Sequence, residues 1–236
     1  SVWCGAGMVS SGELTSEADR ATIARIEEEV RSTYVRSATL TEKARIEGSS
    51  KKRRTFTLSG KQVRDADVTY LSEVLASETV AQYLSTLRLD GNLLTASGVG
   101  TLCETLVCAA DITALRELSL ADNPRLLLPG VAELAKWMPH SHFGLSTLRL
   151  AGCTLESPAG IALAAAIPQC ASLTHVDLRR NLLDDAAVEA LLTACTPPQA
   201  SGGVEQVLRV TIDVEGNPMV SAALFGKVSV LCGMYS

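Results

Sequence analysis

His175 and Asp177 are the pair in this sequence whose types and spacing come closest to catalytic chemistry. One residue separates them in LTHVDL, so on an extended strand they lie on one face and are able to pair. A histidine oriented by a carboxylate is part of the serine hydrolase triad, but no G-x-S-x-G turn accompanies this pair. A surface contact on an open sheet is the more common role of such a pair. The sequence therefore predicts no catalytic residues and no enzymatic activity.

Motifs for metal and cofactor binding are equally weak. His140 and His142 form an H-x-H pair that offers two metal ligands, but no cysteine or acid lies near them in the sequence. Gly98 and Gly100 lack the following G-K-S/T of a phosphate-binding loop. We therefore expect neither a metal site nor a cofactor.

The cysteines indicate the compartment. There are seven of them, an odd number, and no C-x-x-C spacing occurs. Most lie among leucine and alanine at apolar positions, which favours small buried side chains in a reducing environment, with a zinc site as the alternative. We expect an intracellular location: the cytoplasm, or an organelle or large assembly reached from it. The seven residues are Cys4, Cys103, Cys108, Cys153, Cys170, Cys195 and Cys232.

Composition argues against several classes of partner. The formal net charge is −5, whereas proteins that bind duplex nucleic acid carry a clear basic excess, so we do not expect direct nucleic-acid binding. No apolar run of about 18 residues occurs, which predicts no membrane span. Residues 1–15 do not have the pattern of a signal peptide.

The elements that position these residues follow an internal repeat. The pattern L-x-x-L-x-L-x-x-N/C-x-L predicts a strand and a turn, and it occurs in four clear and two degenerate copies. Successive copies are 31, 31, 30, 28 and 36 residues apart. In the third copy Pro124 and Arg125 disturb the pattern, and we expect Leu126 to take the apolar position. The copies begin at Arg53, Leu84, Leu115, Leu145, Leu173 and Arg209.

A second period runs through the other half of each copy. Apolar residues recur at helical spacing, and each stripe starts 15 or 16 residues after the first position of its copy. Two independent periods with a constant offset predict six strand–helix units. The stripes are Val68, Leu71 and Leu75; Val99, Leu102, Cys103 and Leu106; Val131, Leu134, Ala135 and Met138; Ile161, Ala164 and Ala165; Val188, Leu191, Leu192 and Cys195; and Leu224, Val228 and Leu231.

Residues 51–236 resemble the leucine-rich-repeat proteins of the ribonuclease-inhibitor-like subclass. The resemblance rests on repeat length, on the strand–helix unit, and on Cys153, which stands where four other copies carry asparagine. It implies an α/β solenoid, a horseshoe arc of about six repeats with a parallel sheet on the concave side and helices on the convex side. At the turn after each strand an asparagine amide satisfies backbone groups, and Cys153 fills the same space with weaker hydrogen bonds. The asparagines are Asn92, Asn123, Asn181 and Asn217.

Residues 1–50 lie outside the repeats, and we predict an N-terminal arm or helical cap there, ahead of a repeat domain over 51–236. Ile23, Ile26 and Val30 recur at helical spacing. The segment either covers the open first layer of the solenoid or docks on a partner as a helix in a groove.

The family resemblance places protein binding on the concave face, at the strand positions between the inward-pointing leucines. The central ladder of that face is predicted to be Thr57, Arg88, Ser119, Arg149, Asp177 and Asp213. The face has no tryptophan or tyrosine, so Arg88, Arg149 and Arg179 are the strongest candidates, through bidentate contacts with acidic groups of a partner. The candidate binding residues on this face are Arg88, Glu117, Arg149, His175, Asp177 and Arg179.

The C-terminal end is the second candidate surface. Terminal repeats usually carry a polar outer face, but this sequence ends in LFGKVSVLCGMYS, which is largely apolar. The last strand, predicted over Thr211–Val214, would leave an edge that Asp213 and Glu215 protect only in part. We therefore predict that this end contacts another chain or a second copy of this chain, through Val228 and Leu231.

Together these features predict a protein-binding scaffold or a structural subunit of a larger assembly, with a protein partner that the sequence does not identify. The alternative within the same fold family is a GTPase-activating or other regulatory protein, for which we find no matching loop residue. An actin-end-binding module shares the layout of an arm followed by repeats, but residues 1–50 lack tropomyosin-binding heptads.

Overall fold

The structure is a computed structural model that describes residues 45–47, 54–76, 81, 84–109, 112–140, 144–196 and 210–231. The chain divides into two compact units, Ser1–Thr39 and Leu40–Ser236, and every described residue lies in the second. Most of the predicted arm over 1–50 therefore lies outside the described residues, and the division between arm and repeats stays a prediction.

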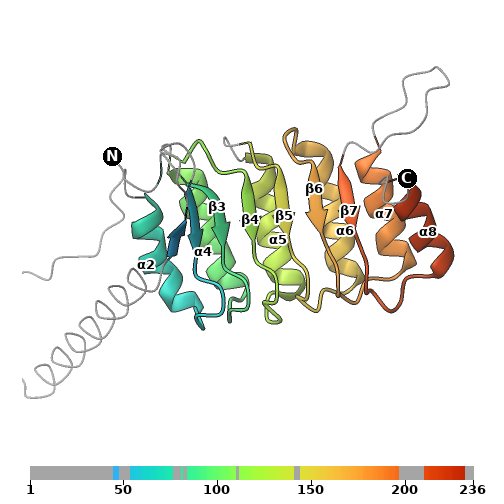
Figure 1. Cartoon of the computed structure of the whole chain (residues 1–236), viewed down its shortest axis with the longest axis horizontal. Helices are drawn as coiled ribbons and strands as arrows, with labels where there is room; N and C mark the ends of the chain where they lie inside the picture. Colours follow the sequence, from blue (N-terminus) through green and yellow to red (C-terminus); the bar gives the residue numbers. More distant parts are fainter. Residues whose placement is uncertain are drawn as a thin grey trace, which may run out of the picture. The chain divides into compact units, whose positions relative to one another are not determined.

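Seven strands form one sheet in chain order (Figure 1): β1 (Arg45–Glu47), β2 (Arg54–Thr57), β3 (Leu84–Arg88), β4 (Glu117–Ser119), β5 (Thr147–Arg149), β6 (His175–Asp177) and β7 (Thr211–Asp213). β2 to β7 run parallel, and each comes from one of the six predicted repeat copies. β1 pairs with β2 in the antiparallel direction and so covers the first edge of the parallel sheet.

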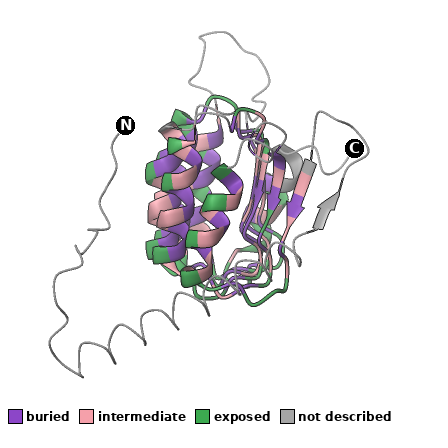
Figure 2. Ribbon diagram, turned by 90° about the vertical axis from the view of Figure 1, so that its left-hand side faces the viewer, coloured by how far each residue is buried: buried purple, intermediate pink, exposed green. Residues whose placement is uncertain are grey.

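Six helices of the described region alternate with the parallel strands: α2 (Asp65–Ala76), α4 (Ala96–Cys108), α5 (Leu127–Trp137), α6 (Ser157–Ala166), α7 (Asp185–Cys195) and α8 (Ala222–Leu231). Short 3-10 turns extend α5 and α6 at Met138–His140 and Ile167–Gln169. The helices gather on one face of the sheet (Figure 2). The predicted solenoid of strand–helix repeats is confirmed.

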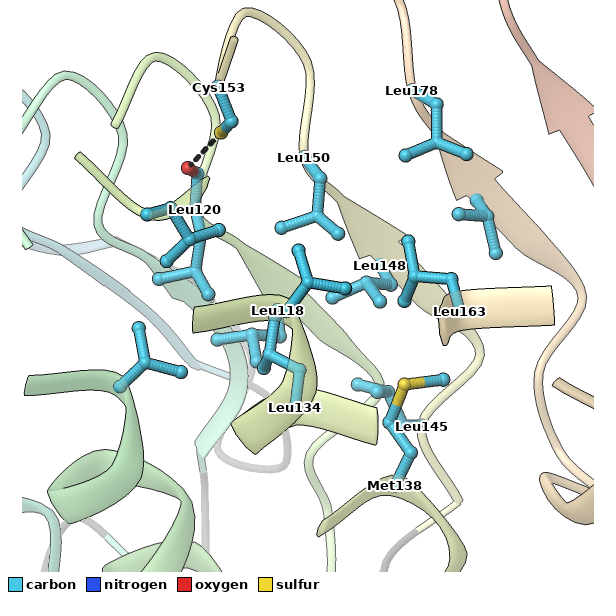
Figure 3. Close-up of a cluster of buried hydrophobic side chains, with 14 of the residues drawn as sticks. Leu118, Leu120, Leu134, Met138, Leu145, Leu148, Leu150, Cys153, Leu163 and Leu178 are labelled. Atoms are coloured by element: carbon cyan, nitrogen blue, oxygen red, sulfur yellow. Dashed lines mark hydrogen bonds between the residues drawn. The ribbon is translucent and has the colours of Figure 1, made fainter. Parts of the chain in front are cut away.

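The core is the layer between sheet and helices. The central residue of each strand pairs with that of the next, as Leu118 does with Leu148, and these side chains are at most 4% exposed. Figure 3 shows Leu118, Leu148 and Leu163 within this layer. Leu126 is also fully buried, as predicted for the irregular third copy. The six central residues are Phe56, Leu87, Leu118, Leu148, Val176 and Ile212.

The helix stripes agree with prediction in most repeats. The first, second and fifth stripes are buried throughout. In the third, Val131, Leu134 and Met138 are buried whereas Ala135 is half-buried, and the core also takes Trp137, which we did not predict. Leu224 and Val228 of the sixth stripe are buried, and the side chain of Leu231 lies outside the described residues.

The prediction of the fourth stripe is wrong for Ile161 and Ala165 and right for Ala164. Ile161 is 48% exposed and Ala165 is exposed, while α6 buries Leu163 and Ala164. The α6 sequence SPAGIALAAA is apolar on every side, so hydrophobicity alone does not define which face is buried. The close approach of α6 to α7 determines the buried face instead, because a Cβ atom at Gly160 would lie 3.0 Å from the Cβ of Ala187 in α7.

Buried asparagines join neighbouring repeats where the chain leaves each strand. Each Nδ2 donates to the carbonyl three residues earlier and to a carbonyl of the preceding repeat; in Asn181 both bonds, to Leu178 and Leu150, are 2.9 Å. Asn181 Oδ1 accepts from the backbone N–H groups of Cys153 and Leu155 at 3.0 Å. The predicted role of the asparagines in satisfying backbone groups is confirmed.

Cys153 takes the asparagine position in the fourth repeat with fewer bonds. Its Sγ donates to the carbonyl of Leu120 at 3.2 Å, the dashed line in Figure 3. Burial raises the pKa of this thiol to about 12. The thiol therefore stays protonated at neutral pH and remains a hydrogen-bond donor.

A residue with left-handed backbone precedes each asparagine and also Cys153. In two repeats this residue is not glycine. Gly91, Gly152 and Gly216 have φ of 62°, 66° and 73°, whereas Asp122 and Arg180 both adopt 54°. A side chain at positive φ carries strain that glycine avoids. Asp122 and Arg180 form an ion pair across Gly152, with Arg180 Nη2 3.4 Å from Asp122 Oδ1. Two charged residues thus occupy positions where glycine would suit the backbone better.

The C-terminal repeat is the last layer of the described sheet. β7 is the terminal strand in the sheet order, as predicted. Val228 of α8 is 2% exposed and packs into the core, so it is not available as an exposed contact residue. No helix of the described residues is both long enough and apolar enough to span a membrane.

Candidate protein-binding face

The sheet face opposite the helices carries the predicted ladders. Because successive strand residues point to opposite faces, the neighbours of the buried central residues lie on this face. Strand pairing aligns Arg88 with Ser119, Ser119 with Arg149, and Arg149 with Asp177. The flanking ladder aligns Glu117 with Thr147 in the same way. The register predicted from the repeat spacing is therefore confirmed residue by residue.

Six charged side chains on this face form a continuous series of ion pairs, which we call the charge ladder: Arg88, Glu117, Arg149, Asp177, Arg179 and Asp213. Glu117 Oε1 accepts from Arg88 Nη2 at 3.4 Å and from Arg149 Nε at 2.9 Å. Arg149 Nη1 lies 3.9 Å from Asp177 Oδ2. Arg179 Nη2 lies 2.8 Å from Asp177 Oδ2, and its Nε lies 3.2 Å from Asp213 Oδ2. The charges alternate in sign, so the ladder is neutral as a whole.

Asp177 is the most buried member of the charge ladder, with a side chain 3% exposed. Burial raises the pKa of this carboxyl, but the hydrogen bonds and charge of Arg179, together with the charge of Arg149, outweigh that effect. Its pKa consequently lies below the ordinary value of 3.8. The carboxylate is charged at neutral pH and orients two arginines.

The ion pairing of Asp177 predicts a loss of stability in acid. A carboxyl whose pKa is lower in the folded chain stabilises the fold above its ordinary pKa, and this contribution disappears as the pH falls below about 4. Urea unfolding at pH 7 and pH 3 should therefore show a smaller loss of stability in an Asp177→Asn variant than in the unmodified chain. Equal losses in the two proteins would contradict the assignment.

The three arginines of the charge ladder form ion pairs but remain partly exposed to solvent. The side chains of Arg88, Arg149 and Arg179 are 46%, 38% and 42% exposed. A guanidinium carries five N–H donors, and within the described residues the ion pairs use only part of them. The face therefore presents oriented, charged donors, which suit a carboxylate or carbonyl oxygen of a partner.

A second polar cluster extends the face toward the first repeats. Asp90 Oδ1 accepts from the backbone N–H of Ala121 at 3.1 Å and from the hydroxyl of Ser119. Asp90 Oδ2 accepts from Ser59 Oγ at 3.2 Å. Our candidate set omitted both Asp90 and Asp213, although their places in the repeat put them beside the chosen residues.

The structure does not combine His175 and Asp177 into a catalytic pair. His175 is half-buried, and strand pairing sets it between Thr147 and Thr211. The carboxylate of Asp177 is instead bound by Arg179, at 3.0 Å from Nε to Oδ1. Within the described ranges, no group of three or more His, Cys, Asp or Glu side chains is arranged to hold a metal ion. His142 lies outside those ranges.

The predicted C-terminal contact residues are not brought to this face. Val228 lies in the core on the helix side, and the side chain of Leu231 is outside the described residues. The other six candidates, by contrast, sit on neighbouring strands, or just after a strand, of one sheet face. The candidate site is therefore the charge ladder together with His175.

Two comparisons with known proteins bear on this arrangement. Residues 169–192, which include β6 and most of α7, match the family model described as Leucine Rich repeat. The chain is also 30% identical over 158 residues to NACHT, LRR and PYD domains-containing protein 9 from Bos taurus. The aligned region is 56% of this chain and 16% of that relative, so the chain corresponds to a small part of it.

Proposed function

We propose that this leucine-rich-repeat protein is a scaffold, or a structural subunit of a larger assembly, that binds a partner protein through the charge ladder. Its repeats indicate a protein-interaction role in general. Binding without catalysis, and membership of the ribonuclease-inhibitor-like subclass, are parts of the same proposal. The subclass is supported by the repeat length and by Cys153 in an asparagine position.

The observation that carries the proposal is the way Glu117 and Asp177 hold three arginines. Each ion pair restricts an arginine side chain before any partner arrives, so less conformational entropy is lost on binding. Carboxylates on the partner would meet donors that are already oriented. Alternating charge along the ladder also makes the face selective, because a partner must match both signs in order.

The described cysteines support the proposed intracellular, reducing compartment. Cys103, Cys108, Cys153, Cys170 and Cys195 are present as thiols, and all but Cys108 are buried. Burial raises the pKa of Cys103, as it does that of Cys153, to about 12. Such thiols behave as small apolar side chains.

The experiment is affinity purification of the tagged chain, identification of stoichiometric partners by mass spectrometry, and measurement of partner affinity for variants. An Arg88→Ser/Arg149→Ser double variant is expected to bind the partner at least about 30-fold more weakly, the size of an interface hot spot. Arg64→Ser is the matched control, because Arg64 is exposed but lies beside α2, away from the charge ladder.

Two outcomes would overturn the proposal. The first is full partner affinity in the double variant while thermal unfolding shows it to be folded. The second is stimulation of GTP hydrolysis when the chain is assayed against a panel of small GTPases, which would favour the regulatory alternative.

A further inference from the structure

Exposed apolar side chains recur after the strands of the later repeats. Among the described residues, the large apolar side chains that remain exposed all belong to the third to sixth repeats. They follow the strands, in the loops that lead into the helices or in the first half of a helix. They are Leu127 at 48%, Leu128 at 42%, Ile161 at 48%, Leu182 at 41% and Met219 at 64% exposed.

Backbone pairing places two of these residues, Leu182 and Met219, against the preceding repeat. Leu182 forms a parallel bridge with Glu156, and its N–H donates to the carbonyl of Leu155 at 2.8 Å. Met219 forms the equivalent bridge with Asp184 one repeat later. Leu182 and Met219 therefore occupy corresponding places in successive repeats, and we call these two residues, with the pocket described next, the apolar edge.

A pocket of about 260 Å³ begins the apolar edge between the third and fourth repeats. Leu127, Leu128 and Pro129 at the start of α5 form one wall, and Thr154, Glu156 and Pro158 before and within α6 form the other. The pocket lies beside Leu182, since Glu156 both lines the pocket and forms the bridge to Leu182. Its lining is mostly apolar, and an exposed apolar surface of this kind can mark an interaction site.

The backbone of Leu127, which lines the pocket, is strained although its side chain is exposed. Its φ is 48°, in the left-handed region where a leucine carries strain that asparagine or glycine tolerates. Its side chain is nevertheless nearly half exposed, so the strain is not repaid by burial in the core. Backbone strain of this kind clusters at functional sites, including those that hold ligands.

Glu156 gives the pocket its charge. It occupies the N-cap position of α6 but makes no side-chain cap hydrogen bond. Asp184, in the same position of the next repeat, caps α7 by accepting from the N–H of Ala187 at 2.9 Å. Glu156 is exposed and is the one charged residue among those that line this mostly apolar pocket. A cationic group on an apolar stem matches this combination.

We propose that the apolar edge binds a segment of a partner protein that carries a lysine or arginine beside aliphatic residues. The basic side chain lies in the pocket, its methylene groups against Leu127 and Leu128 and its charged end at Glu156. The aliphatic side chains cover Leu182 and Met219 in the following repeats. Where Leu182 and Met219 form parallel bridges with the preceding repeat, neighbouring repeats are about 5 Å apart, close to the 5.4 Å pitch of an α-helix, so a helical segment matches this part of the edge.

The test uses a random 12-residue peptide library displayed on phage and panned on the full chain. Enriched peptides are expected to contain a lysine or arginine together with aliphatic residues. A synthetic peptide from the enriched set should bind Leu127→Asn and Leu182→Ser/Met219→Ser variants at least about tenfold more weakly. Leu127→Asn should keep full thermal stability, because asparagine accepts the left-handed backbone, so its weaker binding would not come from unfolding.

Glu156 is tested with a charge-neutral variant and a matched control. The synthetic peptide should bind the Glu156→Gln variant about fivefold more weakly than the unmodified chain. A peptide in which norleucine replaces the basic residue should bind this variant with the same affinity as the original peptide does. Glu104→Gln, the same change at an exposed acid of α4, should bind like the unmodified chain.

Several results would overturn this inference. One is panning that enriches no sequence, or only sequences without a basic residue. Another is a peptide that binds Leu127→Asn at full affinity; if it is lost from Arg88→Ser/Arg149→Ser instead, the charge ladder is its site and the proposed function stands. A third is self-association in sedimentation that disappears in Leu182→Ser/Met219→Ser, which would make the edge a contact between copies of this chain.

Discussion

Replacing Asn181 with alanine is expected to lower the free energy of unfolding by about 3 kcal/mol. The side chain is 1% exposed and makes bonds of 2.9 to 3.0 Å to four backbone groups of the fourth and fifth repeats. Alanine leaves the carbonyl of Leu150 and the N–H groups of Cys153 and Leu155 without these bonds in a buried turn. Each such group costs about 1 to 3 kcal/mol when water cannot replace the lost partner.

Cys153→Ala is the matched control at the equivalent position. It removes one S–H donor, and the carbonyl of Leu120 still accepts from the amide of Asn123 at 2.9 Å. We expect a loss of about 1 kcal/mol, since no backbone group is left without a bond. Urea unfolding followed by circular dichroism measures both variants. Equal losses would show that the asparagine amide is not what joins the repeats.

The repeat architecture was predictable because two periods mark it independently. Leu84, Leu115, Leu145 and Leu173 open strand motifs at nearly constant spacing, and each helix follows at a constant offset. Equal spacing also sets the strand register, so the alignment of Arg149 with Asp177 follows from the sequence. Parallel stacking of like units leaves little freedom in these features.

Side-chain contacts on the sheet face were predictable only in part. The sequence places Arg88, Arg149 and Arg179 on one face, but it does not show with which carboxylate each arginine forms an ion pair. Glu117 lies in the flanking ladder and still bonds two arginines of neighbouring strands. The ion pairs that form depend on side-chain rotamers and on burial, which the strand register alone does not determine.

The repeat pattern of the sequence also does not show which leucines are exposed. Leu126, Leu127 and Leu128 are consecutive and identical in type, yet the first is fully buried and the other two are more than 40% exposed. Backbone direction at the start of α5 separates them, through the positive φ of Leu127. An apolar residue in a repeat is therefore not by itself evidence of a core position, as α6 also shows.

Leu163→Ala is expected to lower the free energy of unfolding by about 3 kcal/mol, and Ile161→Ala by less than about 0.5 kcal/mol. Leu163 is fully buried on the sheet side of α6, whereas Ile161, two residues earlier, is 48% exposed. Truncating Leu163 removes apolar contacts and leaves a cavity between the helix and strands β5 and β6. Alanine at Ile161 gains helix propensity, which offsets the modest burial that is lost.

The pair of variants decides which way α6 faces, because the apolar pattern of the sequence predicts the opposite order. If Ile161 pointed inward, Ile161→Ala would cause the larger loss of unfolding free energy and Leu163→Ala would cause almost none. Guanidinium unfolding of both variants, with the slope of the transition compared to confirm a common unfolded state, separates the two orientations. Gly160 explains why the structure has Leu163 inside: the helix approaches α7 so closely on that side that a Cβ at position 160 would lie 3.0 Å from Leu183 Cδ2. With that contact fixed, rotating α6 to bury Ile161 would move Gly160 away from α7 and open a gap between the repeats.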